Sequence, residues 1–236
     1  MDADSLKTAP LPSVRRLPAY LRFLQTLKAR GRDVVSCTHI ADELGLVSTQ
    51  VRKDLAVTGI VGKPKVGYNV PALINAIEEF LGWKNTSDAF VVGVGCLGSA
   101  LMGYEGFKDY GLNLVAGFDV APAKIGIPVH GKEVFPLEKL HDLALRMHVL
   151  IGVLTVPAAV AQDTANFLVL SGIRAIWNYT PVQLEVPPSV IVEDVKLSAS
   201  LAVLSSRLAE VLRSPNAVRR QAAATAPKEK ETWIRN

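Results

Sequence analysis

A glycine-rich turn at residues 93–98 constrains the fold of this chain more than any other feature. It forms the pattern G-x-G-x-x-G directly after the apolar run 90–94, which predicts a β-strand, and directly before a predicted helix. Gly93 permits the tight turn, Gly95 lets a pyrophosphate approach the backbone, and Gly98 allows the helix to pack closely on the strand. Free amides at the helix N-terminus then face the anion. The sequence therefore predicts a dinucleotide-binding loop whose contact residues are Gly93, Val94, Gly95, Cys96, Leu97 and Gly98.

An acidic residue downstream supports this interpretation. Asp119 lies at the end of the next predicted strand, 21 residues after Gly98, where a carboxylate can accept hydrogen bonds from both ribose hydroxyls. The same charge would repel a 2′-phosphate, so the pattern favours NAD(H) over NADP(H). The alternative is that the glycines only reverse the chain. Cys96 has two interpretations, a redox-sensing thiol at a helix N-terminus or a small residue tolerated beside the cofactor.

The second half of the chain alternates between short apolar runs and amphipathic patterns. The strand candidates are residues 90–94, 114–118, 149–155, 175–178 and 190–192. Helices are expected to follow Gly98, Pro136, Pro157 and Lys196. Such βα units indicate an α/β Rossmann fold, a doubly wound parallel sheet, which we assign to residues 88–195.

The first half predicts a winged helix-turn-helix domain over residues 13–84. Helices are expected at 14–30, 38–44 and 49–57, the last capped by the Ser48 hydroxyl. Glycines and a proline between two lysines at 59–70 then predict a β-hairpin, and Pro71 begins a fourth helix. A polar linker at 84–88 separates the two domains.

The third predicted helix offers side chains for reading DNA. Val51 and Leu55 are expected to face the core, which leaves the opposite side to polar residues. Gln can pair with an adenine edge, and Arg or Lys can reach guanine acceptors or phosphates. The wing tip adds two lysines. The candidate DNA-binding residues from this pattern are Ser48, Thr49, Gln50, Arg52, Lys53, Lys63 and Lys65.

The charge distribution agrees with a polyanion partner for the first half alone. Residues 13–68 hold ten Lys/Arg and four Asp/Glu, a net charge of +6, whereas residues 86–212 hold eight and twelve, a net charge of −4. The alternative is a basic surface that is only solvated.

The composition excludes several classes of protein. No apolar run approaches the about 20 residues of a membrane span, the N-terminus lacks a signal-like apolar region, and two cysteines form no disulfide framework. We therefore expect a cytoplasmic protein. No catalytic triad, metal-ligand cluster or carboxylate pair stands out, so neither an enzyme nor a metal site is expected. Two alternatives stay open: an NAD-dependent oxidoreductase with an accessory helix-turn-helix domain, and a CoA- or nucleotide-binding module, which Asp119 disfavours.

With these residues in view, the span from about 15 to 212 resembles the Rex family of redox-sensing transcriptional repressors. The matching runs are residues 50–55, 66–68, 93–98, 118–119, 124–126, 154–157, 178–181 and 184–187. The resemblance implies a homodimer on a pseudo-palindromic operator, with a C-terminal helix at 196–213 exchanged between subunits. It also implies that NADH releases the DNA and that NAD⁺ competes without releasing it.

The resemblance adds further site residues. It implies cofactor contacts at Lys124, Tyr104, Thr155, Pro157 and Asn178. Tyr68 joins the DNA-binding set. Arg22, Tyr104 and Lys196 match positions of the family's switch.

Two departures from the family pattern bear on the switch and on operator preference, not on the fold. Lys196 stands where the family usually has an aspartate that pairs with the arginine matching Arg22. Either Asp194 or Glu193 substitutes for that aspartate, or the DNA-bound form is locked differently. The wing has Pro64 and Lys65 where Arg-Gly is usual, and residues 56–58 are less aromatic. The tail at 214–236 is expected to be disordered.

Overall fold

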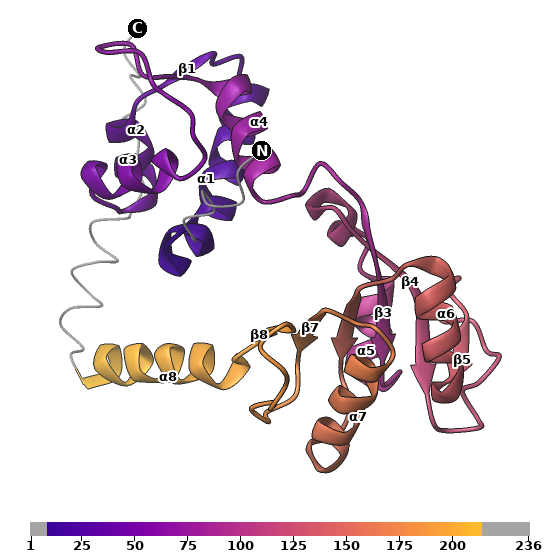
Figure 1. Cartoon of the computed structure of the whole chain (residues 1–236). Helices are drawn as coiled ribbons and strands as arrows, with labels where there is room; N and C mark the ends of the chain where they lie inside the picture. The colour runs from indigo at the N-terminus through magenta and orange to yellow at the C-terminus, as the bar shows by residue number, and fades with distance from the viewer. Residues whose placement is uncertain (1–8, 214–236) are drawn as a thin grey trace, which may run out of the picture. The chain divides into compact units, whose positions relative to one another are not determined.

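The computed structural model describes residues 9–213, and the tail predicted at 214–236 lies outside the described residues. Four of the described helices form the N-terminal part (Figure 1). They are α1 (Leu11–Ala29), α2 (Cys37–Leu44), α3 (Ser48–Ala56) and α4 (Val70–Phe80). Two short strands, β1 (Val34–Val35) and β2 (Tyr68–Asn69), pair antiparallel. The helix-turn-helix with a fourth helix is thus confirmed, with ends shifted by a few residues.

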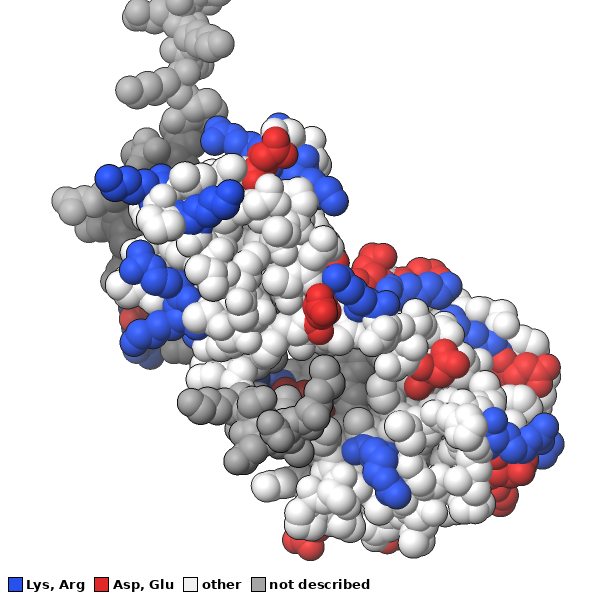
Figure 2. Space-filling view, turned by 45° about the horizontal axis from the view of Figure 1, so that its top comes forward, with Lys and Arg blue, Asp and Glu red and all other residues white. Residues whose placement is uncertain are grey.

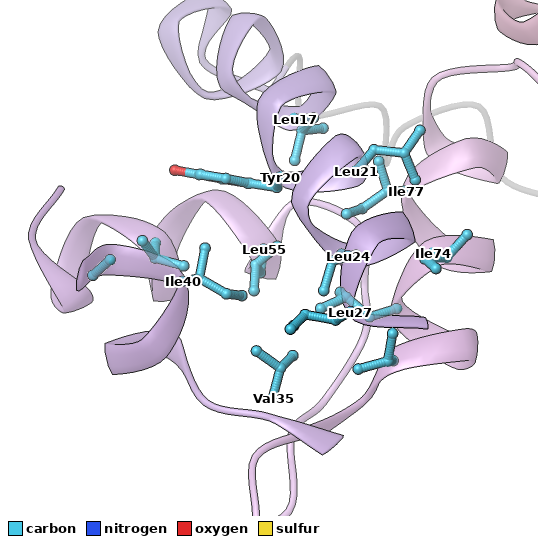
Figure 3. Close-up of a cluster of buried hydrophobic side chains, with 14 residues drawn as sticks. Leu17, Tyr20, Leu21, Leu24, Leu27, Val35, Ile40, Leu55, Ile74 and Ile77 are labelled. Atoms are coloured by element: carbon cyan, nitrogen blue, oxygen red, sulfur yellow. The ribbon is translucent and has the colours of Figure 1, made fainter. Parts of the chain in front are cut away.

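One apolar cluster holds the N-terminal part together (Figure 3). Helix α1 contributes a stripe with steps of three and four residues, which is the period of one helix face. Val51 and Leu55 of α3 are fully buried, as the sequence predicted. The buried members from α1 are Leu17, Tyr20, Leu21, Leu24 and Leu27.

The expected cap of α3 was wrong by one residue. Val47, with extended backbone, is the N-cap, and Ser48 is already helical. The carbonyl of Val47 accepts hydrogen bonds from the amides of Gln50 and Val51 at 2.9 and 3.1 Å. Ser48 therefore does not cap the helix with its hydroxyl. Side-chain capping does occur on the neighbouring helices, where Ser36 and Asn69 accept from amides in the first turns of α2 and α4.

The predicted hairpin is a small wing between α3 and α4. Lys63 and Gly67 exchange two backbone hydrogen bonds of 2.8 and 2.9 Å, with Pro64, Lys65 and Val66 at the tip. Gly67 has a φ of +98°, and a Cβ there would collide with the carbonyl oxygen of Val35. Only glycine fits where the wing crosses β1.

The second part contains one six-stranded sheet with the order β5-β4-β3-β6-β7-β8. Its strands are β3 (Ser87–Val92), β4 (Leu112–Asp119), β5 (Val134–Pro136), β6 (Ile151–Leu154), β7 (Ala175–Asn178) and β8 (Ile191–Asp194). Strands β4 and β5 lie on one side of β3, and strands β6, β7 and β8 lie on the other, so the strand order reverses at β3. This is the arrangement of a dinucleotide-binding Rossmann sheet. Strands β6, β7 and β8 are parallel, with Leu154 opposite Asn178 and Asn178 opposite Asp194.

The helices of this part follow the positions that the sequence predicted. They are α5 (Cys96–Gly103), α6 (Leu140–Met147), α7 (Ala158–Leu170) and α8 (Leu197–Arg213). Helix α5 begins inside the glycine pattern and not after it. Strand β5 and the 3₁₀ turns at Glu105–Tyr110 and Leu137–Lys139 were not predicted, because they are too short to leave a periodic pattern. No helix among residues 9–213 is long and apolar enough to cross a membrane.

Candidate functional site

The glycine loop leaves β3 in a conformation that needs its glycines. Gly93 has a φ of +94°, and a Cβ there would lie 2.8 Å from the carbonyl oxygen of Thr155. A Cβ on Gly98 would collide with the carbonyl oxygen of Gly93. Gly95 differs, because a Cβ there would meet no atom within 4 Å. Gly93 and Gly98 are thus required by the chain itself, whereas the space beside Gly95 is open to a ligand.

Thr155 fixes this loop from the neighbouring strand. Its amide donates to the carbonyl of Val92 at 2.9 Å, and its hydroxyl donates to the carbonyl of Gly93 at 2.7 Å. Thr155 follows β6, which adjoins β3 in the sheet. The loop therefore lies at the carboxyl ends of the two strands where the topology switches, which is the usual ligand position in such sheets.

Asp119 is bound to the loop as well. It is 8 % exposed, and its carboxylate accepts from the amide of Val94 at 2.8 Å, from the amide of Ala121 at 2.9 Å and from the ammonium of Lys124 at 2.8 Å. Burial opposes ionisation, yet these donors hold the pKa of Asp119 below its usual value. The carboxylate is therefore ionised at neutral pH, and it orients the first turn of the loop.

The outward side of the loop is accessible. Gly95, Cys96 and Leu97 are exposed, whereas Val94 is buried. Pro157 is the N-cap of α7 and is also exposed. The ammonium of Lys124 is part-exposed beside Asp119, so it presents a positive charge next to the carboxylate that was expected to meet the ribose.

The side-chain amide of Asn178 already makes four hydrogen bonds within the chain. Its amide donates to the carbonyl of Val182 at 2.8 Å and to Asp194 at 2.9 Å, and its oxygen accepts from the amide and the hydroxyl of Thr180. Because it is fully buried, Asn178 shapes the carboxyl ends of β7 and β8. A hollow of about 600 Å³ opens beside it, between residues 179–183 and 194–198. Direct contact of Asn178 with a cofactor stays a prediction.

The polar side of α3 is open to solvent. Thr49, Arg52 and Lys53 are exposed, and Ser48 and Gln50 are half-buried. Figure 2 shows Lys and Arg side chains spread over the visible face of the N-terminal part with few acids among them, whereas the two signs alternate on the second part. Arg52 and Lys53 are the exposed cations of α3.

The wing carries Lys63 and Lys65 on its exposed tip. Lys65 has a φ of +63° and follows Pro64 in a turn closed by the amide of Val66 on the carbonyl of Lys63. A hollow of about 490 Å³ lies between the wing and the start of α2, and Arg52 lines it. Tyr68 is half-buried at the base of the wing, where its ring leaves no room for a side chain on Gly62.

Sequence reasoning missed a buried ion pair behind α3. Asp54 is 1 % exposed, and Arg16 of α1 donates to both of its oxygens at 2.6 and 2.7 Å. The hydroxyl of Tyr20 donates to it at 2.6 Å. In Figure 3 this hydroxyl points away from the apolar cluster. Asp54 lies three residues after Val51, on the buried side of α3, and that spacing was the available signal.

Comparison with known proteins finds matches to both parts of the chain. A family model described as "Putative DNA-binding protein N-terminus" matches residues 8–56, and one described as "CoA binding domain" matches residues 84–182. The redox-sensing transcriptional repressor Rex of Treponema denticola is 48 % identical over 198 residues, which cover 84 % of this chain and 94 % of that protein. The Rex repressor of Bacteroides fragilis is 42 % identical over 205 residues, 87 % of this chain and 93 % of that one.

This chain belongs to the Rex family of redox-sensing transcriptional repressors.

Solved structures extend the match to three dimensions. RSP, a Rex-family repressor, was solved in complex with β-NAD⁺ and operator DNA; it is 36 % identical, with a TM-score of 0.81 over 92 % of this chain and 98 % of that one. RSP in complex with β-NADH matches with a TM-score of 0.80 over 89 % of this chain and 98 % of that one.

The residues matched to the Rex switch are all accessible. Arg22 on α1 and Lys196 before α8 are exposed, and Tyr104 is 55 % exposed, with its ring edge-on to Phe107 at 4.9 Å. Asp194, one of the two acids considered as substitutes for the family's aspartate, accepts from Asn178 at 2.9 Å. Its carboxylate is therefore already engaged with β7.

Proposed function

We propose that this Rex-family chain represses transcription as a homodimer bound to pseudo-palindromic operator DNA, and that NADH bound at the 93–98 loop releases it. NAD⁺ competes for the same loop without releasing the DNA. The observation that carries the proposal is the match, at a TM-score of 0.81 over 92 % of the chain, to a repressor solved with both β-NAD⁺ and operator DNA.

The geometry of the loop supports the dinucleotide part of this proposal. Open space beside Gly95 and the exposed residues 95–97 give a pyrophosphate access to the N-terminus of α5. Asp119 and Lys124 lie at the end of β4, where a ribose is bound in such folds. Thr155, Pro157 and Tyr104 complete the proposed cofactor set.

The exposed polar side of α3 supports the DNA part. We assign base and phosphate contacts in the major groove to Thr49, Gln50, Arg52 and Lys53, with Ser48 at the start of the helix. Lys63 and Lys65 reach the adjacent backbone or minor groove from the wing. Tyr68 supports the wing from below.

Helix α8 supports a homodimer. Leu197, Leu201, Leu204, Leu208 and Val211 recur in steps of four and three residues, and each is between 44 % and 64 % exposed. A seam with this spacing is typical of helices that pack against a partner. Light scattering should give twice the monomer mass, and Leu204→Asp should lower it, whereas Ser206→Asp on the other side of α8 should not.

Release by NADH requires a difference in affinity. NADH can displace the DNA only if it binds the DNA-free arrangement of the dimer more tightly than the DNA-bound one, because equal affinity shifts no equilibrium. Arg22, Tyr104 and Lys196 are the residues we assign to this coupling. A lysine at 196 cannot pair with Arg22 as an aspartate would, so we infer that another acid serves in this chain.

The decisive experiment is a mobility-shift titration with operator DNA at fixed salt, in which NADH is varied in the presence of NAD⁺. Rising NADH should release the DNA. No effect at saturating NADH would refute the sensor while leaving DNA binding intact. Calorimetry with CoA and NADPH in parallel tests the loop's ligand, and tight binding of CoA with none of NADH would replace the assignment.

We further propose that the loop senses and does not catalyse, and that the protein acts in the cytoplasm, where operator and NADH pool meet. Its relatives are named as repressors. Steady oxidation of NADH in the presence of small carbonyl compounds would contradict the first statement.

A further inference from the structure

A hollow of about 340 Å³ lies between the start of α1 and a side of α3 that includes the buried Asp54. Three of its lining residues, Thr49, Gln50 and Lys53, belong to the surface that we assign to DNA. A fourth, Arg16, comes from α1 and was not among the expected contacts. The hollow thus joins the reading helix to an arginine 37 residues before Lys53.

Asp54 holds the guanidinium of Arg16 in place. Both oxygens of this buried carboxylate accept from it, and the Tyr20 hydroxyl donates to the same carboxylate. A planar guanidinium that donates to both oxygens of one carboxylate has little rotational freedom. Its position relative to α3 is therefore set before any ligand arrives.

Arg16 retains binding capacity in this arrangement. A guanidinium has five N–H donors, and the two hydrogen bonds to Asp54 use only part of them. The side chain of Arg16 is 28 % exposed, whereas that of Asp54 is 2 % exposed. Arg16, Lys53 and Asp54 all line the hollow, so an anion there would meet two cations and a carboxylate that already accepts two hydrogen bonds from the guanidinium.

We propose that Arg16 is a phosphate-binding residue, which Asp54 positions beside Lys53 so that a DNA backbone phosphate is bound between α1 and α3. The inference rests on the proposed operator binding and adds a contact from outside the reading helix and the wing. It also assigns Asp54, a residue that touches no DNA, the task of positioning that contact.

Salt dependence distinguishes a phosphate contact from a purely structural role. In that second role, which we call a brace, the ion pair between Arg16 and Asp54 only holds α1 against α3. Each phosphate contact adds about 1 to the slope of log K against log salt concentration, and a brace adds nothing. The informative pair is the unaltered protein and the double variant Arg16→Gln/Asp54→Asn. Neither leaves a buried unpaired charge, because the double variant removes both partners of the ion pair, and the two proteins have the same net charge.

With two heads per dimer, we expect the double variant to show a slope about 2 smaller in magnitude than the unaltered protein. Equal slopes for the two would overturn the proposal and leave Arg16 as a brace. Lys28→Met removes one positive charge at the far end of α1 and is expected to leave the slope unchanged.

Two further measurements keep the test decisive. Thermal melting and NADH affinity verify that each variant is folded, and Arg16→Met/Asp54→Asn replaces the double variant if that one melts early. If the unaltered protein binds no operator, the proposed function itself fails. If it binds operator and NADH releases it while the slopes stay equal, only the Arg16 inference fails.

Discussion

The two candidate sites of this chain are built from different parts of the polypeptide. The dinucleotide loop is made mainly of backbone, whose path is held by the absence of side chains at Gly93 and Gly98 and by hydrogen bonds from Thr155 and Asp119. The proposed DNA-reading surface is made of exposed side chains on α3 and the wing, and a buried ion pair holds α3 against α1.

This difference predicts different responses to substitution. In a site made of closely packed backbone, an added side-chain atom collides with the chain, so one substitution is expected to abolish ligand binding. A surface made of exposed cations loses affinity in steps, and each step depends on salt because released counterions supply much of the binding.

The largest effect should follow a single added methyl group in the loop. Gly98→Ala places a Cβ against the carbonyl of Gly93, so we expect loss of NADH binding, at least about 100-fold, and a lower melting temperature. Gly95→Ala is the matched control, since its Cβ meets nothing in the protein. It should also weaken NADH binding, but without loss of stability. Calorimetry and thermal melting measure the two effects, and equal stability losses would contradict the distinction.

The next effect concerns the reading helix. Lys53→Ala should weaken operator binding by about 100-fold in the dimer, because a lost Lys or Arg contact costs about 1–3 kcal/mol and occurs twice. NADH affinity should be unchanged. Mobility shifts at several salt concentrations measure the operator affinity. A matching loss of NADH affinity would show that the two sites are not independent.

A smaller effect should follow neutralisation of Asp119. Asp119→Asn weakens the hydrogen bond from the Val94 amide and releases Lys124, so we expect NADH affinity to fall about tenfold. The carboxylate's folded pKa lies below its unfolded value near 4. Its stabilisation is therefore present above that value and is lost as the pH falls through the folded pKa. NADH binding by the unaltered protein should be level from about pH 8 to about pH 5, and a decline within that window would contradict this.

The smallest effect should come from the brace behind α3. Tyr20→Phe removes one donor to Asp54 and leaves both bonds from Arg16, which predicts a loss of about 1 kcal/mol and a melting temperature lower by a few degrees. Operator affinity should change little at any salt concentration. A large loss of affinity with a normal melting curve would show that the hydroxyl takes part in reading the DNA.

Local patterns in the sequence were enough to predict both folds and most of the exposed site residues. Spacing alone indicated the helix pair, the wing and the glycine loop, because these features depend on neighbours within a few positions. The same reasoning misplaced the cap of α3, since a hydroxyl suited to capping at Ser48 says nothing about which backbone carbonyl the turn presents. It also missed strand β5, which is three residues long.

The sequence by itself therefore determined the elements, the order of the two domains and the residues that face solvent on α3 and the loop. Only the tertiary structure decided which polar groups meet across long separations, such as Arg16 with Asp54, 38 residues apart, and Thr155 with Gly93, 62 residues apart. The physical reason is that periodicity encodes which side of an element is buried. The partner of a buried carboxylate or carbonyl depends on how whole elements pack, which no local pattern specifies.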